Sequence, residues 1–142
     1  MPFYEFTIST NKSEELIDIT SEVEEIVSGS KIKNGIVHIF IPHATAGVIL
    51  NESADPNIKT DFLNALERAI PKRANYLHDH IDRNAAAHIR SAIVGSSLTI
   101  PLRNNGMVLG TWQSIMFCEF DGPRRTRRII VQIIAEPPIS TS

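Results

Sequence analysis

The sequence predicts an α+β fold in which residues 1–142 form one domain, with a mixed, largely antiparallel β-sheet packed against about three helices. Segments near both ends alternate apolar and polar residues with the period of two that is typical of half-buried strands. The last three apolar segments are joined by short turn sequences, which favours antiparallel pairing. Strand and helix do not alternate regularly, and the chain is shorter than the roughly 250 residues of a (β/α)8 barrel.

The first part of the chain is predicted to hold two strands and a helix. Residues 3–9 alternate aromatic or aliphatic side chains with polar ones, and a short strand at 15–19 follows. Ser21 and Glu24 have the spacing of a capping box, so we expect a brief helix to begin there. Ser28-Gly29 is expected to end that helix.

Two further strands precede a longer helix. Residues 36–41 are β-rich, and Pro42 ends this run because proline has no N–H to donate to a neighbouring strand. Residues 48–50 are expected to form a buried strand. Asp55-Pro56 predicts a helix start, since aspartate accepts hydrogen bonds from first-turn amides and proline suits the first helical position. Apolar side chains at helical spacing are expected to turn one helix face into the core: Ile58, Phe62, Leu63, Leu66 and Ile70.

The second half is expected to contain one helix and three closing strands. A polar connection at 72–83 leads into a helix at about 84–94. Strands are predicted at 97–102, 107–120 and 126–134, with turns at Asn104-Asn105-Gly106 and Asp121-Gly122-Pro123.

Composition excludes several function classes. The formal net charge of -2 argues against nucleic-acid binding by general phosphate neutralisation. A single cysteine, Cys118, rules out an internal disulfide, and its apolar surroundings predict a packed core residue. No apolar stretch approaches the roughly 20 residues of a membrane span, and the first residues do not resemble a signal peptide. We therefore expect a soluble, cytoplasmic protein without a membrane or nucleic-acid partner.

Three histidines predict a metal site. His43 follows a strand, His78 lies in the polar connection, and His88 lies on the third helix. Neutral imidazole is a common metal ligand, and three protein ligands with one open position suit a catalytic divalent ion. Imidazole favours zinc over magnesium, although magnesium remains an alternative.

Polar residues near the histidines are further candidates. Asn51 and Glu52 follow the strand at 48–50, where Glu52 would coordinate the ion, act as a general base, or support a histidine. Asn84 stands one turn before His88 and is expected to orient its ring.

The arginines after the Asp121 turn form a candidate anion site. Arg124 and Arg125 are placed to hold phosphate with two parallel hydrogen bonds, whereas 127–128 are expected to be solvated. A positive strand that discourages edge-to-edge aggregation is the alternative. Trp112 would either stack on a flat heterocycle or lie in the core. Gln113 is a polar candidate beside it.

These residues together resemble the YjbQ family over nearly the whole chain. The resemblance implies an α+β fold, a homotrimer, and secondary thiamine-phosphate synthase activity. The matching segments occur in the family's order: His43-Ala44-Thr45-Ala46-Gly47, Asn51-Glu52-Ser53-Ala54-Asp55-Pro56, Tyr76-Leu77-His78, Asn84, Ala87-His88, Leu109-Gly110-Thr111-Trp112-Gln113 and Glu119-Phe120-Asp121-Gly122-Pro123-Arg124-Arg125.

The sequence thus predicts a metal-dependent enzyme that acts on a small phosphorylated heterocycle. In the reaction implied by the resemblance, hydroxymethylpyrimidine pyrophosphate and thiazole phosphate give thiamine phosphate and pyrophosphate. Glu52, Asn51, Arg124 and Arg125 would be catalytic, and Asn84, Trp112, Gln113 and Asp121 would bind the ligand. Two alternatives stay open, namely a metallohydrolase or phosphatase using the three histidines, and a ligand-binding or assembly module with a structural metal.

Overall fold

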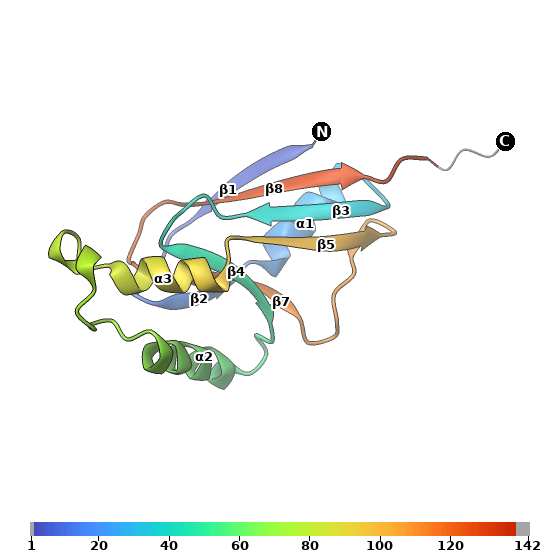
Figure 1. Ribbon diagram of the computed structural model, residues 1–142. Helices are drawn as coiled ribbons and strands as arrows, with labels where there is room; N and C mark the ends of the chain where they lie inside the picture. Colours follow the sequence, from blue (N-terminus) through green and yellow to red (C-terminus); the bar gives the residue numbers. More distant parts are fainter. Residues whose placement is uncertain (1, 139–142) are drawn as a thin grey trace.

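A computed structural model describes residues 2–138, which form eight strands, three α-helices and one short 3-10 helix (Figure 1). The strands are β1 (Phe3–Ile8), β2 (Glu15–Asp18), β3 (Gly35–Phe40), β4 (Ala46–Asn51), β5 (Ser97–Arg103), β6 (Gly106–Met107), β7 (Ser114–Glu119) and β8 (Arg127–Ala135). The helices are α1 (Thr20–Ser30), α2 (Pro56–Ala69), η1 (Leu77–His80) and α3 (Ala85–Val94). This is the predicted α+β fold. No helix in the described range is long and apolar enough to cross a membrane.

The strands form two sheets instead of the single sheet that the sequence suggested. One sheet has the order β1-β8-β3-β5-β6, and the other has the order β2-β7-β4. Every strand pair is antiparallel. Of the closing strands, however, only β5 and β6 pair with each other across a short turn, whereas β7 and β8 lie in different sheets. The sheets lie face to face, and α1 covers part of the space between them (Figure 1).

The main core fills the space between the two sheets and α1. Alternate residues of the central strands point into it, so β7 contributes Ile115 and Phe117, and β8 contributes Ile129, Val131 and Ile133. Each is almost completely buried. Burial of a side chain of this size stabilises a fold by roughly 1.5–3 kcal/mol, so these strands supply much of the stability.

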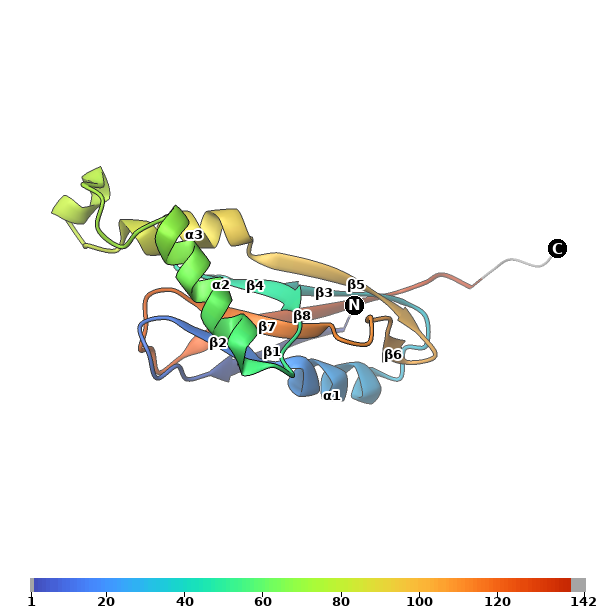
Figure 2. The same cartoon turned by 90° about the horizontal axis from the view of Figure 1, so that it is seen from below.

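A second core lies on the outer face of the three-stranded sheet, where α2 and α3 cover it (Figure 2). Met116 and Cys118 of β7 point to this side, which confirms Cys118 as a buried core residue. The prediction that one face of α2 is core was correct only in part. Phe62, Leu63 and Leu66 pack against this core, but they are only half-buried and α2 has no buried residue. α2 forms an outer layer of the fold, and no further layer of the described chain covers it.

The helix starts were predicted with different success. Asp55 caps α2 as expected, accepting a hydrogen bond from the N–H of Asn57 at 2.9 Å. The capping box of Ser21 and Glu24 was wrong, because α1 already begins at Thr20, with Ile19 at the N-cap. Asp18 accepts from both the N–H and the hydroxyl of Thr20 at that position. The helix also continues past Gly29 to Ser30.

The strand predicted at 107–120 is interrupted. β6 ends at Met107 and β7 begins at Ser114, since the intervening chain leaves one sheet and enters the other. The side-chain oxygen of Gln113 accepts the N–H of Gly110 at 2.8 Å and closes a turn in this passage. The apolar pattern on both sides made the passage look like a continuous strand.

Candidate functional site

The predicted site residues lie at the two opposite ends of the pair β4 and β7. Ala46 is opposite Glu119 at one end, and Asn51 is opposite Ser114 at the other. Five residue steps separate these ends, which corresponds to about 17 Å at a strand rise of ~3.4 Å. The histidines, Asp121 and the arginines belong to the first end, whereas Glu52 and Trp112 belong to the second.

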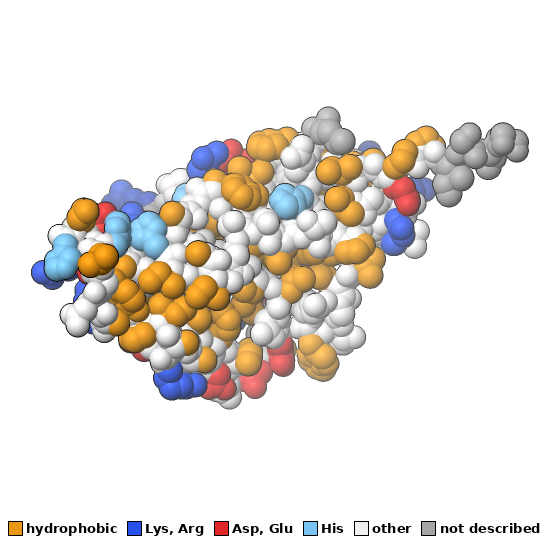
Figure 3. All heavy atoms as spheres, in the orientation of Figure 1, with side chains coloured by type: hydrophobic (Ala, Val, Ile, Leu, Met, Phe, Trp, Pro, Cys, Tyr) orange, Lys and Arg blue, Asp and Glu red, His pale blue; other side chains and the backbone are white. Residues whose placement is uncertain are grey.

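His78 and His88 come together at the first end. Their ring centroids are 4.8 Å apart and the rings meet edge-on. His78 is hydrogen-bonded through Nε2 to Oδ1 of Asn84 at 2.9 Å. Asn84 was expected to orient His88, but the structure gives it His78 as its partner, because η1 folds back over the start of α3. The side chains of Figure 3 show histidines gathered over this part of the surface.

A chain of polar contacts runs from His78 to the arginine loop. The amide nitrogen of Asn84 donates to Asp121 at 3.0 Å. Arg124 donates to the same carboxylate oxygen at 2.9 Å and to the Asp121 carbonyl at 2.8 Å. Asn84 thus links His78 to Asp121, which lies 43 positions further along the chain. The charge of Arg124 is compensated within this chain.

A buried ion pair lies beneath this surface. Glu119 is fully buried and Arg127 nearly so, and the Nε atom of Arg127 donates to Glu119 at 2.9 Å. Thr10 donates its hydroxyl to the same carboxylate, and Thr45 accepts from Arg127 at 3.0 Å. Burial opposes ionisation of Glu119, but hydrogen bonds from Arg127, Thr10 and the Asp121 amide hold its pKa below the usual value.

Sequence reasoning missed this ion pair and placed Arg127 in solvent. A signal was present, because Glu119 continues the inward-facing alternation of Ile115 and Phe117. Arg127 likewise shares the inward phase of β8 with Ile129 and Val131. A charged residue at an inward position of each strand indicates a buried pair. The prediction that Arg128 is solvated was correct, since it is exposed and pairs with Glu5.

Arg125 differs from the neighbouring arginines. Arg124, Arg127 and Arg128 each have a carboxylate partner. Within residues 2–138, the Arg125 guanidinium makes neither an ion pair nor a hydrogen bond, and the residue is exposed. Only its carbonyl is engaged, by the Ser9 hydroxyl at 2.8 Å. Arg125 is therefore the arginine of this loop that can offer a full set of donors to an anion.

His43 lies just beyond the end of β3 and faces α3. Its Nε2 accepts the backbone N–H of Arg128 at 2.8 Å. Burial, followed by the positive charges of Arg127 and Arg128, lowers the pKa of His43. His43 and His88 both line a hollow of about 340 Å³ together with small residues before β4, on α3 and just after α3: Ala44, Ser91, Ala92, Gly95 and Ser96.

The close approach of β4 and α3 shapes this hollow. The N–H of Val48 donates to the Gly95 carbonyl at 3.1 Å, and Ser91 donates its hydroxyl to the Ala46 carbonyl at 2.7 Å. A Cβ atom on Gly47 would lie 2.6 Å from the Gly95 oxygen, so this position requires glycine. Gly47, the last residue of the predicted His43–Gly47 segment, thus allows β4 to pack closely against the end of α3.

The three histidines do not form one ligand set as they are placed in a single chain. Among residues 2–138, no three His, Cys, Asp or Glu side chains are grouped so that they could hold a metal ion. His43 stands across the hollow, with Nε2 already accepting a hydrogen bond. The donor types suit zinc, but their placement does not fit a common ion, so no chemical step below relies on a metal.

Zinc therefore stays a prediction from the sequence, and elemental analysis of the purified protein tests it. A three-histidine site predicts about one zinc ion per chain. If that prediction is right, replacement of His43, His78 and His88 together by alanine removes the ion, whereas the placement described above predicts that the zinc content does not depend on these residues. Unchanged zinc in the triple variant would exclude these histidines as its ligands.

The second end of the sheet pair holds the remaining candidates. Oδ1 of Asn51 accepts the backbone N–H of Glu52 at 2.7 Å. The Glu52 carboxylate has no hydrogen-bond partner among the described residues. Trp112 is 67% exposed, so the core alternative is excluded for it. The side-chain oxygen of Gln113 is engaged in the turn described above, which gives this residue a structural role.

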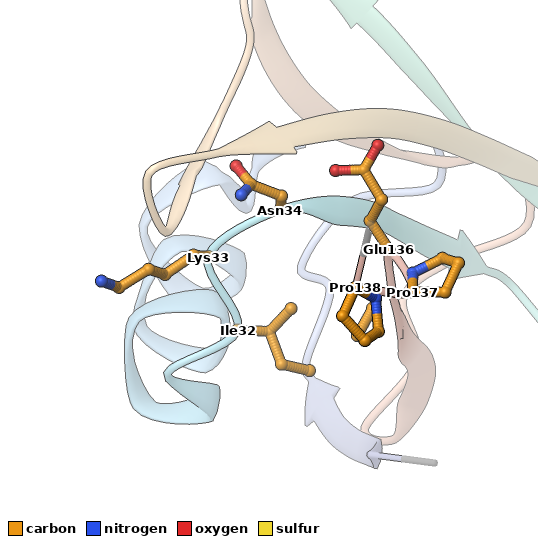
Figure 4. A pocket seen from close by; sticks show the side chains of 7 residues that line it. Ile32, Lys33, Asn34, Glu136, Pro137 and Pro138 are labelled. Atoms are coloured by element: carbon orange, nitrogen blue, oxygen red, sulfur yellow. The ribbon is translucent and has the colours of Figure 1, made fainter. Parts of the chain in front are cut away.

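Another hollow, of about 410 Å³, lies where β8 leads into the last described residues (Figure 4). Ile32, Lys33 and Asn34 line one side, and Glu136, Pro137 and Pro138 line the other. It contains none of the predicted site residues. The histidine end of the molecule is therefore the better candidate site.

The fold and the site define a class of small α+β proteins with two antiparallel sheets and a polar His, Asn, Asp and Arg cluster at one end. The family described as "UPF0047 protein YjbQ-like" matches residues 4–136. The chain belongs to this family.

Relatives resemble the chain over almost its whole length. The UPF0047 protein MJ1081 of Methanocaldococcus jannaschii is 48% identical over 94% of both chains. The UPF0047 protein YugU of Bacillus subtilis is 43% identical over 89% of this chain and 95% of its own. A crystal structure of a YbjQ-like protein of unknown function from Sulfolobus solfataricus has a TM-score of 0.92 at 39% identity, covering 95% of this chain and 97% of its own. These comparisons confirm the family and the fold.

Proposed function

We propose that the protein is an enzyme acting on a phosphorylated heterocycle, most specifically in the synthesis of thiamine phosphate. The observation that carries this proposal is the uncompensated guanidinium of Arg125 next to a surface built from hydrogen-bond donors. Arg125 stands three residues before Arg128, whose N–H binds His43. Three residues of chain span at most about 11 Å, so the Arg125 backbone lies within that distance of the backbone that contacts His43, which supports a site that uses both residues.

The proposed reaction develops negative charge on pyrophosphate, which hydrogen-bond donors at the histidine end of the molecule can stabilise. The thiazole nitrogen forms a bond to the methylene carbon of the pyrimidine, while the carbon–oxygen bond to pyrophosphate breaks. The bonding electrons leave with pyrophosphate. Preorganised donors such as Arg125 stabilise this developing negative charge, and electrostatic stabilisation of that kind often contributes more to catalysis than any other single effect.

The separation of the two ends supports a site shared between chains. Glu52 and Trp112 lie about 17 Å along the strands from the histidine end, too far to contact the same small substrate. In a ring of identical chains, each contact joins two different surfaces. We propose a homotrimer in which Glu52 and Trp112 of one chain complete the histidine end of the next.

An apolar surface beside the histidines suits such a contact. Ile89 and Ile93 of α3 are 37% and 66% exposed, and the apolar face of α2 is only half-buried. Figure 3 shows hydrophobic side chains gathered over α2 and α3, next to the histidines. Contiguous apolar patches of this kind mark interaction surfaces.

The first activity prediction concerns Arg125. The variant Arg125→Ala should weaken the use of phosphorylated substrates by about 1.5–3 kcal/mol, the scale of hydrogen bonds to a charged group. The assay measures thiamine phosphate formed from the two half-molecules, alongside phosphate released from each. Arg103→Ala is a matched control, because Arg103 is also exposed but lies on β5 and pairs with Glu136.

The same assays separate the proposed enzyme from its rivals. Synthesis that falls in Arg125→Ala and not in Arg103→Ala supports thiamine-phosphate synthesis. Glu52→Gln should mainly lower turnover, because it removes a carboxylate and leaves the phosphate contacts. Phosphate release with the same dependence would instead identify a phosphatase. If neither reaction responds, the site serves ligand binding or assembly.

A further inference from the structure

The hollow between His43 and His88 has an unusual lining for a metal site. Its described lining residues include two imidazoles and two serines but no carboxylate and no thiol. The remaining lining side chains are small, which leaves about 340 Å³ of space. Such a lining offers hydrogen-bond donors to a ligand and almost no negative charge to a cation.

The contact with Arg128 fixes which nitrogen of His43 carries the proton. A backbone N–H can only donate, so Nε2 of His43 must accept and must be unprotonated. In the neutral ring the proton is then on Nδ1. β3 pairs with β8 as far as Phe40 and Ile130, and His43 supplies the acceptor for Arg128 just beyond this point.

Nδ1 of His43 is available to a ligand. It has no hydrogen-bond partner among residues 2–138, and none of the buried side-chain nitrogens or oxygens in that range lacks a partner. The Nδ1 atom is therefore not enclosed by the protein. The ring is fixed through Nε2, while Nδ1 stays accessible and the residue lines the hollow.

We propose that His43 is a neutral hydrogen-bond donor, through Nδ1, to a phosphate group bound in the hollow, and not a metal ligand. The choice of phosphate rests on the proposed function. A ring fixed by a backbone hydrogen bond is already oriented for its ligand, so it loses little freedom on binding.

Electrostatics favours an anion over a metal ion at this position. Burial, and then the positive charges of Arg127 and Arg128, lower the pKa of His43, while the Glu119 carboxylate opposes them and Arg124 adds a smaller effect. Because these arginines are all paired with carboxylates, the unpaired guanidinium of Arg125 is the charge that attracts phosphate and repels a divalent cation. Coordination through Nε2 would also remove the hydrogen bond that this atom accepts from the Arg128 N–H.

Two substitutions of His43 separate donor from acceptor. An asparagine amide nitrogen falls near the position of Nδ1, whereas a glutamine oxygen reaches toward the position of Nε2. His43→Asn should therefore keep much of the affinity for inorganic phosphate, measured by calorimetry. His43→Gln should keep the Arg128 contact and lose affinity on the order of tenfold. Equal retention in both variants, or a greater loss in His43→Asn than in His43→Gln, would overturn the donor role.

Nuclear magnetic resonance tests the tautomer directly in the wild-type protein. Long-range correlations between ring carbon-bound protons and ring nitrogens distinguish Nδ1–H from Nε2–H. We expect the Nδ1–H form near neutral pH, with the Nδ1 resonance shifting as inorganic phosphate is added. An Nε2–H ring, or a ring that responds to zinc and not to phosphate, would contradict the proposal.

A steric block tests the place of binding. Ala92 lines the hollow and is exposed on α3, whereas Ser28 is exposed on α1 and does not line it. Ala92→Trp should abolish the phosphate-induced shift of His43, and Ser28→Trp should leave it unchanged. A shift that survives in Ala92→Trp places the phosphate elsewhere and rejects the hollow.

These outcomes also distinguish this inference from the proposed function. Phosphate that binds at His43 without any thiamine phosphate being formed would support the donor role and reject the synthase. Synthesis that is unaffected by His43→Gln and Ala92→Trp would support the synthase and reject the hollow as its phosphate site.

Discussion

Arg127→Ala should lower the free energy of unfolding by about 3–5 kcal/mol, the usual cost of removing one partner from a buried ion pair. The substitution leaves the Glu119 carboxylate fully buried without its cation, and Thr45 loses its donor. Urea denaturation monitored by circular dichroism measures this loss. We expect the midpoint to fall sharply while the slope of the transition stays unchanged.

Arg128→Ala is the matched control for that change. The two arginines are adjacent in β8, but Arg128 is exposed and its pair with Glu5 lies at the surface. Exposed ion pairs contribute only about 0–1 kcal/mol. Equal destabilisation by the two substitutions would show that the Glu119–Arg127 pair is not the structural anchor of this end of the molecule.

The same pair predicts an acid-dependent loss of stability. The pKa of Glu119 is lower in the folded protein than in the unfolded chain, because the hydrogen bonds to its carboxylate outweigh burial. Its contribution is therefore complete above the unfolded value of about 4.3 and is lost as the pH falls through the folded pKa. Denaturation at decreasing pH should show this loss in the wild type.

Activity should return when two inactive variants are mixed, unfolded and refolded together. His78→Ala damages the histidine end, and Glu52→Gln damages the other end. If each site takes one end from each of two chains, random mixing leaves about one quarter of the sites with both ends intact. Activity should rise from near zero toward that fraction.

The controls for this experiment are the two variants refolded separately, which should remain inactive. Light scattering should report three chains for each sample. A monomer that keeps full activity on dilution, or mixed samples that stay inactive although trimers form, would contradict a shared site.

Much of the fold followed from local sequence patterns. The period-two segments became strands, and Asp55-Pro56 began α2 with the expected hydrogen bond. The chain passes from one sheet to the other between Met107 and Ser114. The apolar pattern could not predict this passage, because both sheets bury similar side chains. The partial burial of the apolar face of α2 could not be predicted either, since periodicity shows that a face is apolar but not what covers it.

The site was predicted less completely than the fold. The sequence identified His78, Asn84 and Asp121, and the structure joins them through hydrogen bonds. It did not show that Asn84 orients His78 in place of His88. It also gave no sign that the Nε2 atom of His43 serves the backbone of Arg128, because that contact joins residues 85 positions apart.

A crystal structure with pyrophosphate and thiazole phosphate bound would decide whether the histidine end is the substrate site. We predict a phosphate group within hydrogen-bond distance of Nδ1 of His43 and of the Arg125 guanidinium, with Glu52 of a neighbouring chain facing the same ligand. Ligand bound instead in the hollow beside Pro137 and Pro138, or a metal ion coordinated by His43 with phosphate absent, would contradict this prediction.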